Sequence, residues 1–540
     1  MDDGAASLAS GPGGAAAAAV TVVATAAADG ARPPARLRHN LLANMVGSGW
    51  TALAYVVCVP LYIKLMGIES YGLVGFFVTL VAVSSLLELG LGATLNRELA
   101  RRSVDPDAAG DSRDLVRTLE LIYWGLAATM GALTVVLAPT IAHHWLRSST
   151  LSAATVQSAI ILMGLVLTFQ WPLSLYSGGL RGLERQVALN SILVVMMTIR
   201  TGGAVLVLWL VTPTIHAFFV WQLLAAAAHT GVAGIVLWRI LPAGRRARFR
   251  RDLLRGIWRF AAGLSATSVL ILVLTQSDKV ILSSILSLRF FAYYSLAALA
   301  AGSLAYVFLP AFQAAFPRFS ALVAVGDEAG LIRTYHRMAQ VVAVLILPSA
   351  ILVAAFSRRI VEIWTGSADT ASHTHTLLTL LILGTALNGL MTLPYALSLA
   401  YGWTRWPFFL NLAAVVIFLP ALVVLALTYG GDGAAAAWLT LNAGYVLVGM
   451  HTLHRRLLPR EKLRWYLQDV AAPALAAAAV VAAARALIPA GLGTPPTLAL
   501  LAATLVLAVL AAAASVLGIP RPSELAAQAV RLARSRPNAS

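Results

Sequence analysis

The sequence predicts an all-α polytopic membrane protein with about fourteen transmembrane helices, and three observations support this fold class. Only 11% of the 540 residues are charged, and the mean hydropathy is +0.82, whereas soluble proteins carry about 25% charged residues. Apolar runs of about 20 residues, long enough to cross a hydrocarbon core of roughly 30 Å, recur along the chain. No segment alternates polar and apolar residues over about ten positions, as the strands of a membrane barrel do.

The apolar runs predict the order of the elements. The fourteen spans are expected at residues 42–66, 72–96, 118–138, 155–177, 189–211, 216–238, 257–286, 292–317, 336–356, 376–399, 406–428, 433–453, 470–488 and 496–518. The predicted organisation is a disordered tail (1–39), a first lobe of six helices (40–240), a basic linker (241–256), a second lobe of six helices (257–456), two further helices (470–518) and a second tail (519–540).

The basic residues predict the orientation of the chain. The tails and the even-numbered loops together contain 31 of the 39 Lys and Arg residues, the opposite side contains 5, and 3 lie within spans. By the positive-inside rule, both termini and the basic loops face the cytoplasm. The net charge of +17 is therefore expected to reflect insertion into the cell's inner membrane and contact with membrane lipid, and no nucleic-acid partner is predicted.

Two short motifs recur after six spans. The segment "SYGL" (70–73) before span 2 resembles "YYSL" (293–296) before span 8, and "RGLERQVALN" (181–190) resembles "YGWTRWPFFLN" (401–411). Six is an even number, so the two halves share one orientation and are expected to be related by an axis along the membrane normal. The expected architecture is two six-helix lobes around a central cavity, with the last two helices outside the repeat.

Polar residues form stripes along four of the predicted helices. Because helical positions three or four apart share a face, we expect a wet cavity between spans 1, 2, 7 and 8. Its candidate residues are Asn44, Ser48, Thr51, Tyr55, Glu88, Asn96, Thr275, Asp278, Lys279, Ser283, Tyr306 and Gln313. Helix packing is the alternative for the hydroxyl residues, since small polar side chains also join membrane helices.

Ionised residues inside spans strengthen the cavity hypothesis, because a charge at the bilayer centre normally faces a cavity or a partner. Arg200 lies near the middle of span 5 and is expected either to pair with a buried acid or to face the cavity. Asp278 and Lys279 are adjacent in "LTQSDKVILSS" (274–284). Neighbouring helical side chains diverge by about 100°, so we expect them not to pair. Lys279 is then free to bind an anion, unless it extends to the membrane interface.

No metal site or cofactor is predicted. The single cysteine, Cys58, excludes a disulfide framework and a cysteine-based metal centre. His143 and His144 stand at the end of a helix without acidic or cysteine neighbours in the sequence.

Several longer segments resemble one family. Residues 60–100, "PLYIKLMGIESYGLVGFFVTLVAVSSLLELGLGATLNRELA", resemble the first hairpin of the polysaccharide transporters, the O-antigen and lipid-linked oligosaccharide flippases of the multidrug/oligosaccharidyl-lipid/polysaccharide exporter superfamily. The segments "QSDKVILSSILSLRFFAYYSLA" (276–297), "PAFQAAFPRFSAL" (310–322) and "RRIVEIWTG" (358–366) are similar to later signatures of this family. One departure is Glu88, where the family pattern has Asp.

The resemblance implies a non-enzymatic exporter that moves a polyprenyl-pyrophosphate-linked oligosaccharide by alternating access. Lys279 is then the expected anion contact, with Arg200 as a helper, and Glu88 or Asp278 is the candidate group for coupling to H⁺ or Na⁺. A polysaccharide polymerase and glycosyltransferases of the same pathway are possible partners.

Two alternatives belong to other functional classes. A drug/cation antiporter of the same superfamily has the same predicted architecture. A membrane glycosyltransferase or polymerase usually needs a large outer loop with acidic residues, whereas the outer acids here, Glu69, Glu362, Asp369 and Asp432, are scattered over short loops.

Overall fold

The computed structural model describes residues 35–517 except 89–90, 103–108, 243–245 and 490–491, and describes side chains except at 35–48, 52, 86–87, 109–110 and 253–266. Most of the predicted N-terminal tail and all of residues 519–540 lie outside the described part. Residues 35–39, which the sequence places in the disordered tail, instead begin the first helix. Two prolines, Pro33 and Pro34, stand just before this start, and proline is well tolerated at the beginning of a helix.

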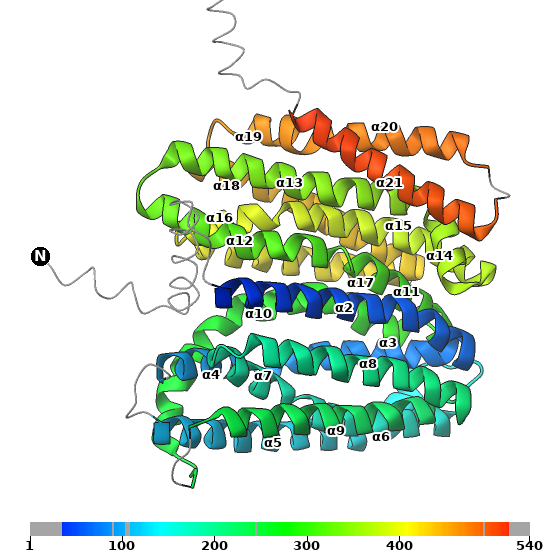
Figure 1. The fold of residues 1–540 in the computed structure, drawn as a ribbon. Helices are drawn as coiled ribbons and strands as arrows, with labels where there is room; N and C mark the ends of the chain where they lie inside the picture. The colour runs from blue at the N-terminus through cyan, green and yellow to red at the C-terminus, as the bar shows by residue number, and fades with distance from the viewer. Residues whose placement is uncertain (1–34, 89–90, 103–108, 243–245, 490–491, 518–540) are drawn as a thin grey trace, which may run out of the picture.

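The described chain is built of helices that run side by side in one bundle (Figure 1). In chain order they are α2 (Ala35–Met66), α3 (Ile68–Ser84), α4 (Leu91–Arg102), α5 (Ala109–Thr140), α6 (Ala153–Gln170), α7 (Leu173–Gly182), α8 (Gln186–Leu210), α9 (Ile215–Ile240), α10 (Arg251–Ile285), α11 (Leu288–Gly302), α12 (Ala305–Ala324), α13 (Glu328–Ala355), α14 (Ser357–Thr365), α15 (Ala368–Leu390), α16 (Thr392–Ala400), α17 (Arg405–Gly444), α18 (Met450–Leu457), α19 (Lys462–Arg464), α20 (Ala472–Leu487) and α21 (Thr494–Leu517). Short turns join some of them, namely the 3-10 turn η2 (Ser85–Glu88) and the π-turns η4 (Ile141–Trp145), η5 (Tyr445–Gly449) and η6 (Trp465–Ala471).

Twelve helical segments of the described chain are long and apolar enough to cross a membrane. One of them, residues 405–457, folds back on itself. Gly430 has φ 59° and ψ −133°, which no helix contains, and the Tyr445 hydroxyl donates to Asn411, 34 residues earlier, over 2.7 Å. A straight helix would separate these two residues by roughly 50 Å. Residues 405–457 therefore form two antiparallel arms joined at Gly430, as the sequence predicts for spans 11 and 12.

No single helix within the second predicted span is long enough to cross the membrane. The apolar helix α3 has 17 residues, and η2 and α4 continue it. Fourteen crossings require that this broken span and both arms of residues 405–457 traverse the membrane. The number fourteen stays a prediction.

Four predicted spans are interrupted near their middle. Span 2 breaks between α3 and α4, and span 8 breaks at Ser303. Span 4 breaks at Trp171, and span 10 breaks at Met391. In span 8, Pro310 and Pro317 both lie inside α12, downstream of the interruption at Ser303.

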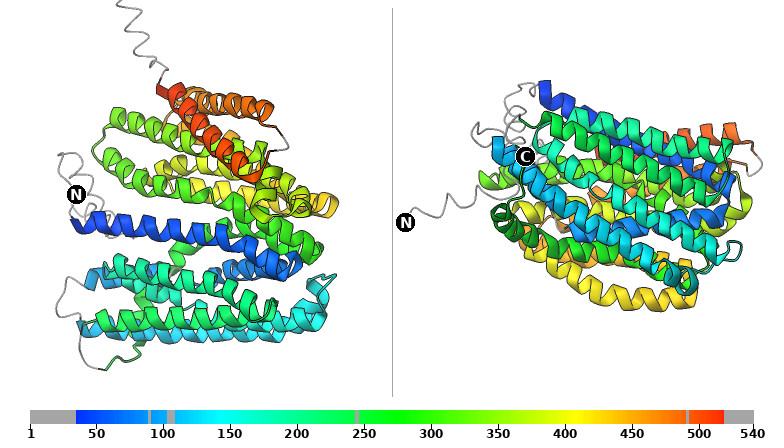
Figure 2. Two further views of the ribbon diagram at one scale, coloured as in Figure 1. Left: turned by 45° about the vertical axis from the view of Figure 1, so that its right-hand side comes forward. Right: turned by 90° about the horizontal axis from the view of Figure 1, so that it is seen from below.

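The same helix contacts occur in both halves of the chain. In the first half α2 packs on α8, α4 on α7, α5 on α6 and α6 on α9; in the second half α10 packs on α17, α12 on α16, α13 on α15 and α15 on α17. We call α2–α9 the N-lobe and α10–α18 the C-lobe. Figures 1 and 2 show each set as a group of neighbouring helices. This agreement fits a parallel repeat, and the exact domain boundaries stay a prediction.

The last two long helices lie outside the repeat. Both α20 and α21 pack on α13 and on each other, at the edge of the bundle (Figure 1). At the basic end, His336 of α13 is buried between two acids, with one ring nitrogen against Asp469 and the other 2.8 Å from Glu461. Ionised carboxylates only accept hydrogen bonds, so the arrangement fits an imidazolium that donates to both acids. This cluster fixes the C-terminal helices to the C-lobe.

Candidate functional site

The two lobes meet most extensively where α3 lies against α11, at the end of the bundle opposite the basic loops, which we call the outer end. The backbones approach closely there. A Cβ on Gly72 would collide with the backbone of Leu288, and a Cβ on Gly75 would collide with the side chain of Ser295. Each repeated tyrosine motif lies on one of these two helices and contributes one residue to the contact, Gly72 from the first and Ser295 from the second.

A second set of contacts closes the same end. The loop after η4 reaches the C-lobe, where Leu288 donates its N–H to the carbonyl of Arg147 over 2.7 Å and Arg147 forms a parallel β-bridge with Ser287. The Trp145 indole donates to the Ser283 hydroxyl over 2.9 Å. Ser283, a predicted cavity residue, is only 2% exposed. In this structure Ser283 makes a contact between the lobes.

Asp278 and Lys279 form an ion pair on α10 that also reaches α11. The Lys279 ammonium lies 3.2 Å from both carboxylate oxygens of Asp278 and donates to the Thr275 carbonyl over 2.9 Å. Asp278 accepts a further hydrogen bond from the Tyr294 hydroxyl over 2.5 Å. Asp278 is 5% exposed, while the Lys279 side chain is 21% exposed. Asp278 therefore contacts a neighbouring helix, as expected, and one side of Lys279 remains open.

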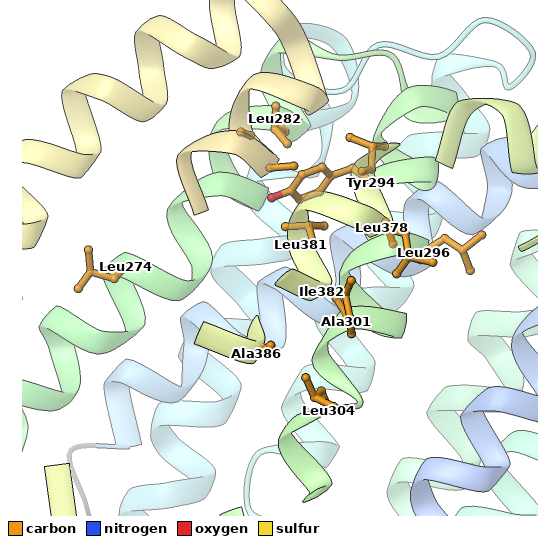
Figure 3. Packing of buried hydrophobic residues seen from close by; sticks show 14 of the residues in the cluster. Leu274, Leu282, Tyr294, Leu296, Ala301, Leu304, Leu378, Leu381, Ile382 and Ala386 are labelled. Atoms are coloured by element: carbon orange, nitrogen blue, oxygen red, sulfur yellow. The ribbon is translucent and has the colours of Figure 1, made fainter. Parts of the chain in front are cut away.

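The expectation that Asp278 and Lys279 do not pair is wrong. Their Cβ atoms do point in different directions, but the four-carbon stem of Lys279 bends back toward the carboxylate. An isolated carboxylate removed from water costs several kcal/mol, and the surroundings here are apolar. Figure 3 shows Tyr294 among Leu282, Leu378 and Leu381, which are all buried. The low dielectric constant favours direct charge pairing over separate roles for the two residues.

Arg200 has neutral partners in the N-lobe. Its Nε donates to Gln222 on α9, and one terminal nitrogen donates to Gln170 at the end of α6 over 2.9 Å. The expected buried acid is not among these partners. Its positive charge is therefore solvated by two side-chain amides in place of water and is not neutralised by them.

Glu88 and Asn96 belong to a separate group inside the N-lobe. The Tyr123 hydroxyl on α5 lies 3.3 Å from the Glu88 carboxylate, and Gly92, one turn later, lies against the same carboxylate. The backbone of Asn96 packs on Gly182 of α7. The carboxylate of Glu88 therefore faces Tyr123 of α5.

The remaining candidates come from α2, α10 and α12. Tyr55 is half-buried on α2 and packs against the core, and Tyr306 is 47% exposed on α12. Thr51 is half-buried on the same helix as Tyr55, and Gln313 is exposed on α12. The Thr275 hydroxyl bonds within its own helix, to Leu272. The side chains of Asn44 and Ser48 lie outside the described part.

Sequence reasoning missed several functional neighbours. Gln170 and Gln222 interrupt apolar runs just as Arg200 does, and three polar residues in neighbouring spans are a usable signal for a shared site. Tyr294 was noted only as part of a repeated motif, although its hydroxyl binds Asp278. The contact between Trp145 and Ser283 joins positions 138 residues apart and has no signal in the local sequence.

Comparison with known families gives one family match and one relative among curated proteins. A family model described as "Polysaccharide biosynthesis protein" matches residues 37–323, more than half of the chain. A putative O-antigen transporter from Shigella flexneri is 21% identical over 411 residues, which make up 74% of this chain and 93% of the relative.

Solved structures with the same fold are membrane transporters. An inward-facing multidrug resistance MATE family transporter of the MOP superfamily superposes with a TM-score of 0.60 at 14% identity, covering 76% of this chain and 96% of that one. The lipid II flippase MurJ in an inward closed conformation superposes with a TM-score of 0.58 at 13% identity, covering 88% and 98%. At these identities the likeness establishes the fold alone.

Proposed function

Because this chain belongs to the polysaccharide biosynthesis protein family, we propose that it moves a polyprenyl-pyrophosphate-linked oligosaccharide across the inner membrane by alternating access. The product of this step is a precursor of a cell-surface polysaccharide. The proposal is supported by the family match and by the O-antigen transporter of Shigella flexneri, which aligns over nearly its whole length. In this proposal both termini face the cytoplasm.

The physical task explains why charged and amide groups lie within the bundle. A glycan head group with a pyrophosphate cannot enter hydrocarbon unaided, because its charges and hydroxyls would lose water without replacement. Lys279, Arg200 and the amides around Arg200 can replace part of that water. The polyprenyl tail stays in the lipid.

The ion pair suggests how the substrate is linked to a coupling cation. A pyrophosphate that approaches the open side of Lys279 competes with Asp278 for the ammonium. Asp278, still bound to Tyr294, is then left with an uncompensated charge. Uptake of H⁺ or Na⁺ by this carboxylate restores neutrality, so binding of the anion favours binding of the cation. Glu88 is the second candidate for the coupling acid.

The main support for the alternating-access proposal is that contacts between the two lobes close the outer end. The contacts of α3 with α11 and of Arg147 with Leu288 join the lobes there. Lys279 lies nine residues before Leu288, or roughly 13 Å deeper at 1.5 Å per residue. The closed outer end separates Lys279 from the periplasmic side, and release of the substrate requires that these contacts break.

A reversible cross-link tests this requirement. Cys58 is the only native cysteine in the sequence, so Cys58→Ser provides a cysteine-free background for the pair Arg147→Cys and Ser287→Cys. Bridged residues on adjacent strands lie about 4.8 Å apart, within the Cα separation that a disulfide spans. We expect oxidation to stop the appearance of new surface polysaccharide and reduction to restore it.

Each single-cysteine variant is the control and is expected to export normally under oxidation. Normal export by the fully cross-linked protein would show that the lobes need not separate at the outer end. Sensitivity of the cells to cationic drugs is measured in parallel. Loss of drug resistance with intact polysaccharide export would favour the antiporter alternative.

The predicted orientation has its own test. Reporter fusions after residues 110, 250, 327 and 460 are expected to report the cytoplasm, and fusions near 147, 213 and 367 the periplasm. A cytoplasmic signal at 213 or 367 would contradict fourteen crossings with cytoplasmic termini.

A further inference from the structure

The N-lobe contains a cavity of about 580 Å³ that lies away from the contact between the lobes. It is lined by α5, by α9 and, beneath them, by residues of α6 and α7, including Phe169 and Tyr176. None of these elements belongs to the C-lobe. Its volume falls within the roughly 300–1,000 Å³ that is usual for small-molecule sites.

The two walls of this cavity have complementary sequence patterns. On α5, Glu120 and Trp124 line the cavity, and Arg113 and Arg117 precede them at helical spacing on the same face. On α9, Ala227, Gly231, Gly234 and Trp238 form a matching stripe in which the middle residues are small. A Cβ at Gly231 would have no atom within 4 Å, so this glycine opens onto empty space.

Glu120, the acidic residue that lines this cavity, is already hydrogen-bonded to donors of the N-lobe. Glu120 is 7% exposed and accepts hydrogen bonds from the Tyr176 hydroxyl over 2.7 Å, from the Trp238 indole over 3.1 Å and from Arg117 over 2.8 Å. A cationic ligand would have to displace one of these donors. The carboxylate therefore orients the aromatic wall and Arg117.

The basic residues are less completely paired. Arg239 lines the cavity and is exposed, and within the described part of the chain it has no hydrogen-bond or ion-pair partner. Arg117 gives one hydrogen bond to Glu120 and keeps 46% of its side chain exposed. Arg113 packs over the Trp238 ring, 5.4 Å from its centroid, and donates to the carbonyl of Pro242 over 3.2 Å. Three arginines against one glutamate leave an excess of positive charge among these residues.

We propose that this cavity binds one anionic glycerophospholipid of the cytoplasmic leaflet. Its phosphate pairs with Arg239 and the free side of Arg117, and one acyl chain lies along Gly231, between Trp124 and Ile235. Basic pockets between membrane helices on the cytoplasmic side are suited to anionic head groups. Because every wall belongs to the N-lobe, the bound lipid stabilises that lobe and is not carried across the membrane.

The test is native mass spectrometry of the purified full-length protein in detergent, titrated with phosphatidylglycerol, phosphatidylethanolamine or undecaprenyl phosphate. We expect one phosphatidylglycerol to bind in preference to the other two. Gly231→Leu places a side chain in the cavity at a position where a Cβ meets no atom within 4 Å, and it is expected to abolish this binding. Arg239→Gln is expected to weaken it about fivefold, the effect of one basic residue near a membrane surface.

The matched control is Gly125→Leu on α5, which also opens onto empty space but does not line the cavity. It is expected to bind phosphatidylglycerol like the native protein. Thermal unfolding gives a second measurement, since a ligand of the folded state raises the melting temperature; the rise with phosphatidylglycerol should disappear in Gly231→Leu.

Three results would overturn the proposal. These are equal binding of the zwitterionic lipid, unchanged binding in Gly231→Leu, and stronger binding of undecaprenyl phosphate. The last would assign the cavity to the polyprenyl class of lipid. None of these results depends on polysaccharide export, so the outcome is separate from that of the proposed function.

Discussion

The charged centre on α10 and the charged centre around Arg200 stabilise a charge within the bundle in different ways. In the C-lobe, Asp278 and Lys279 cancel each other, and Tyr294 adds one hydrogen bond to the carboxylate. In the N-lobe, Arg200 is held by Gln170 and Gln222, which carry no charge. The first centre has no net charge and the second keeps a charge of +1.

This difference teaches what each centre can offer to an anion. An anion that binds Lys279 in the C-lobe must replace Asp278 as the partner of the ammonium. Binding there is therefore linked to how the charge of Asp278 is then compensated. Arg200 can attract an anion without releasing an acid, because its amide partners lose little when they turn toward another donor. A substrate with two phosphates can use both kinds of site.

The largest effect is expected from breaking the C-lobe pair. Lys279→Gln leaves Asp278 buried without a counter-charge, and removal of one partner of a buried pair costs about 3–5 kcal/mol. We expect export to be lost, whereas Lys279→Arg retains part of it because the charge remains. Surface polysaccharide is measured together with the amount of protein in the membrane.

The control for this prediction removes both charges. Asp278→Asn with Lys279→Gln is expected to restore membrane abundance, because replacing a whole buried pair is often nearly neutral, but not to restore export. Full export by Lys279→Gln would mean that Lys279 only anchors the helix at the interface.

A smaller effect is expected in the N-lobe. Arg200→Met leaves the buried Gln222 oxygen and the half-buried Gln170 oxygen without their donor, and only the buried group is expected to have the full cost of roughly 1–3 kcal/mol for an unsatisfied group. We expect a lower melting temperature and reduced export. Arg200→Lys should recover the charge but not both hydrogen bonds, because an ammonium lacks the planar fork of guanidinium. Equal export by Arg200→Met and the native protein would show that the charge at this centre is not used.

The smallest effect is expected from Tyr294→Phe. It removes one hydrogen bond to Asp278 and leaves the ion pair with Lys279 intact. A hydrogen bond to a charged group contributes about 1.5–3 kcal/mol, and we expect the lower end of this range because Lys279 still contacts the same carboxylate. Thermal unfolding of purified protein measures it. A loss as large as that of Lys279→Gln would show that Tyr294, and not Lys279, is the main partner of Asp278.

The fold could be predicted because its signals are local. Apolar length and the positions of basic residues identify the helices, and two short motifs were enough to indicate the repeat that the helix contacts now show. The hairpin at Gly430 also followed from the gap between two apolar runs. Positions of the helix breaks were harder to predict, because the interruption of span 8 at Ser303 coincides with neither of its prolines.

The candidate site could be predicted only in part. Periodicity indicates which residues share a helix face, but not which neighbouring helix that face meets. Glu88 is turned toward Tyr123 and Ser283 toward Trp145, and no spacing rule distinguishes these partners from a cavity. The bend of Lys279 toward Asp278 depends on a flexible side chain in an apolar environment. The N-lobe cavity depends on three segments that are distant in sequence.

The close contact between α3 and α11 also has a mechanical consequence. Gly72 contacts Leu288 close to the outer end of the two lobes. A rotation of one lobe about this contact therefore moves the opposite end of that lobe much further than the outer end. A lobe roughly 30 Å long that turns by about 15° around this point moves its far end by about 8 Å. A bulky side chain at Gly72 would push the two lobes apart at this contact. Its small displacement would become larger at the opposite end of the bundle.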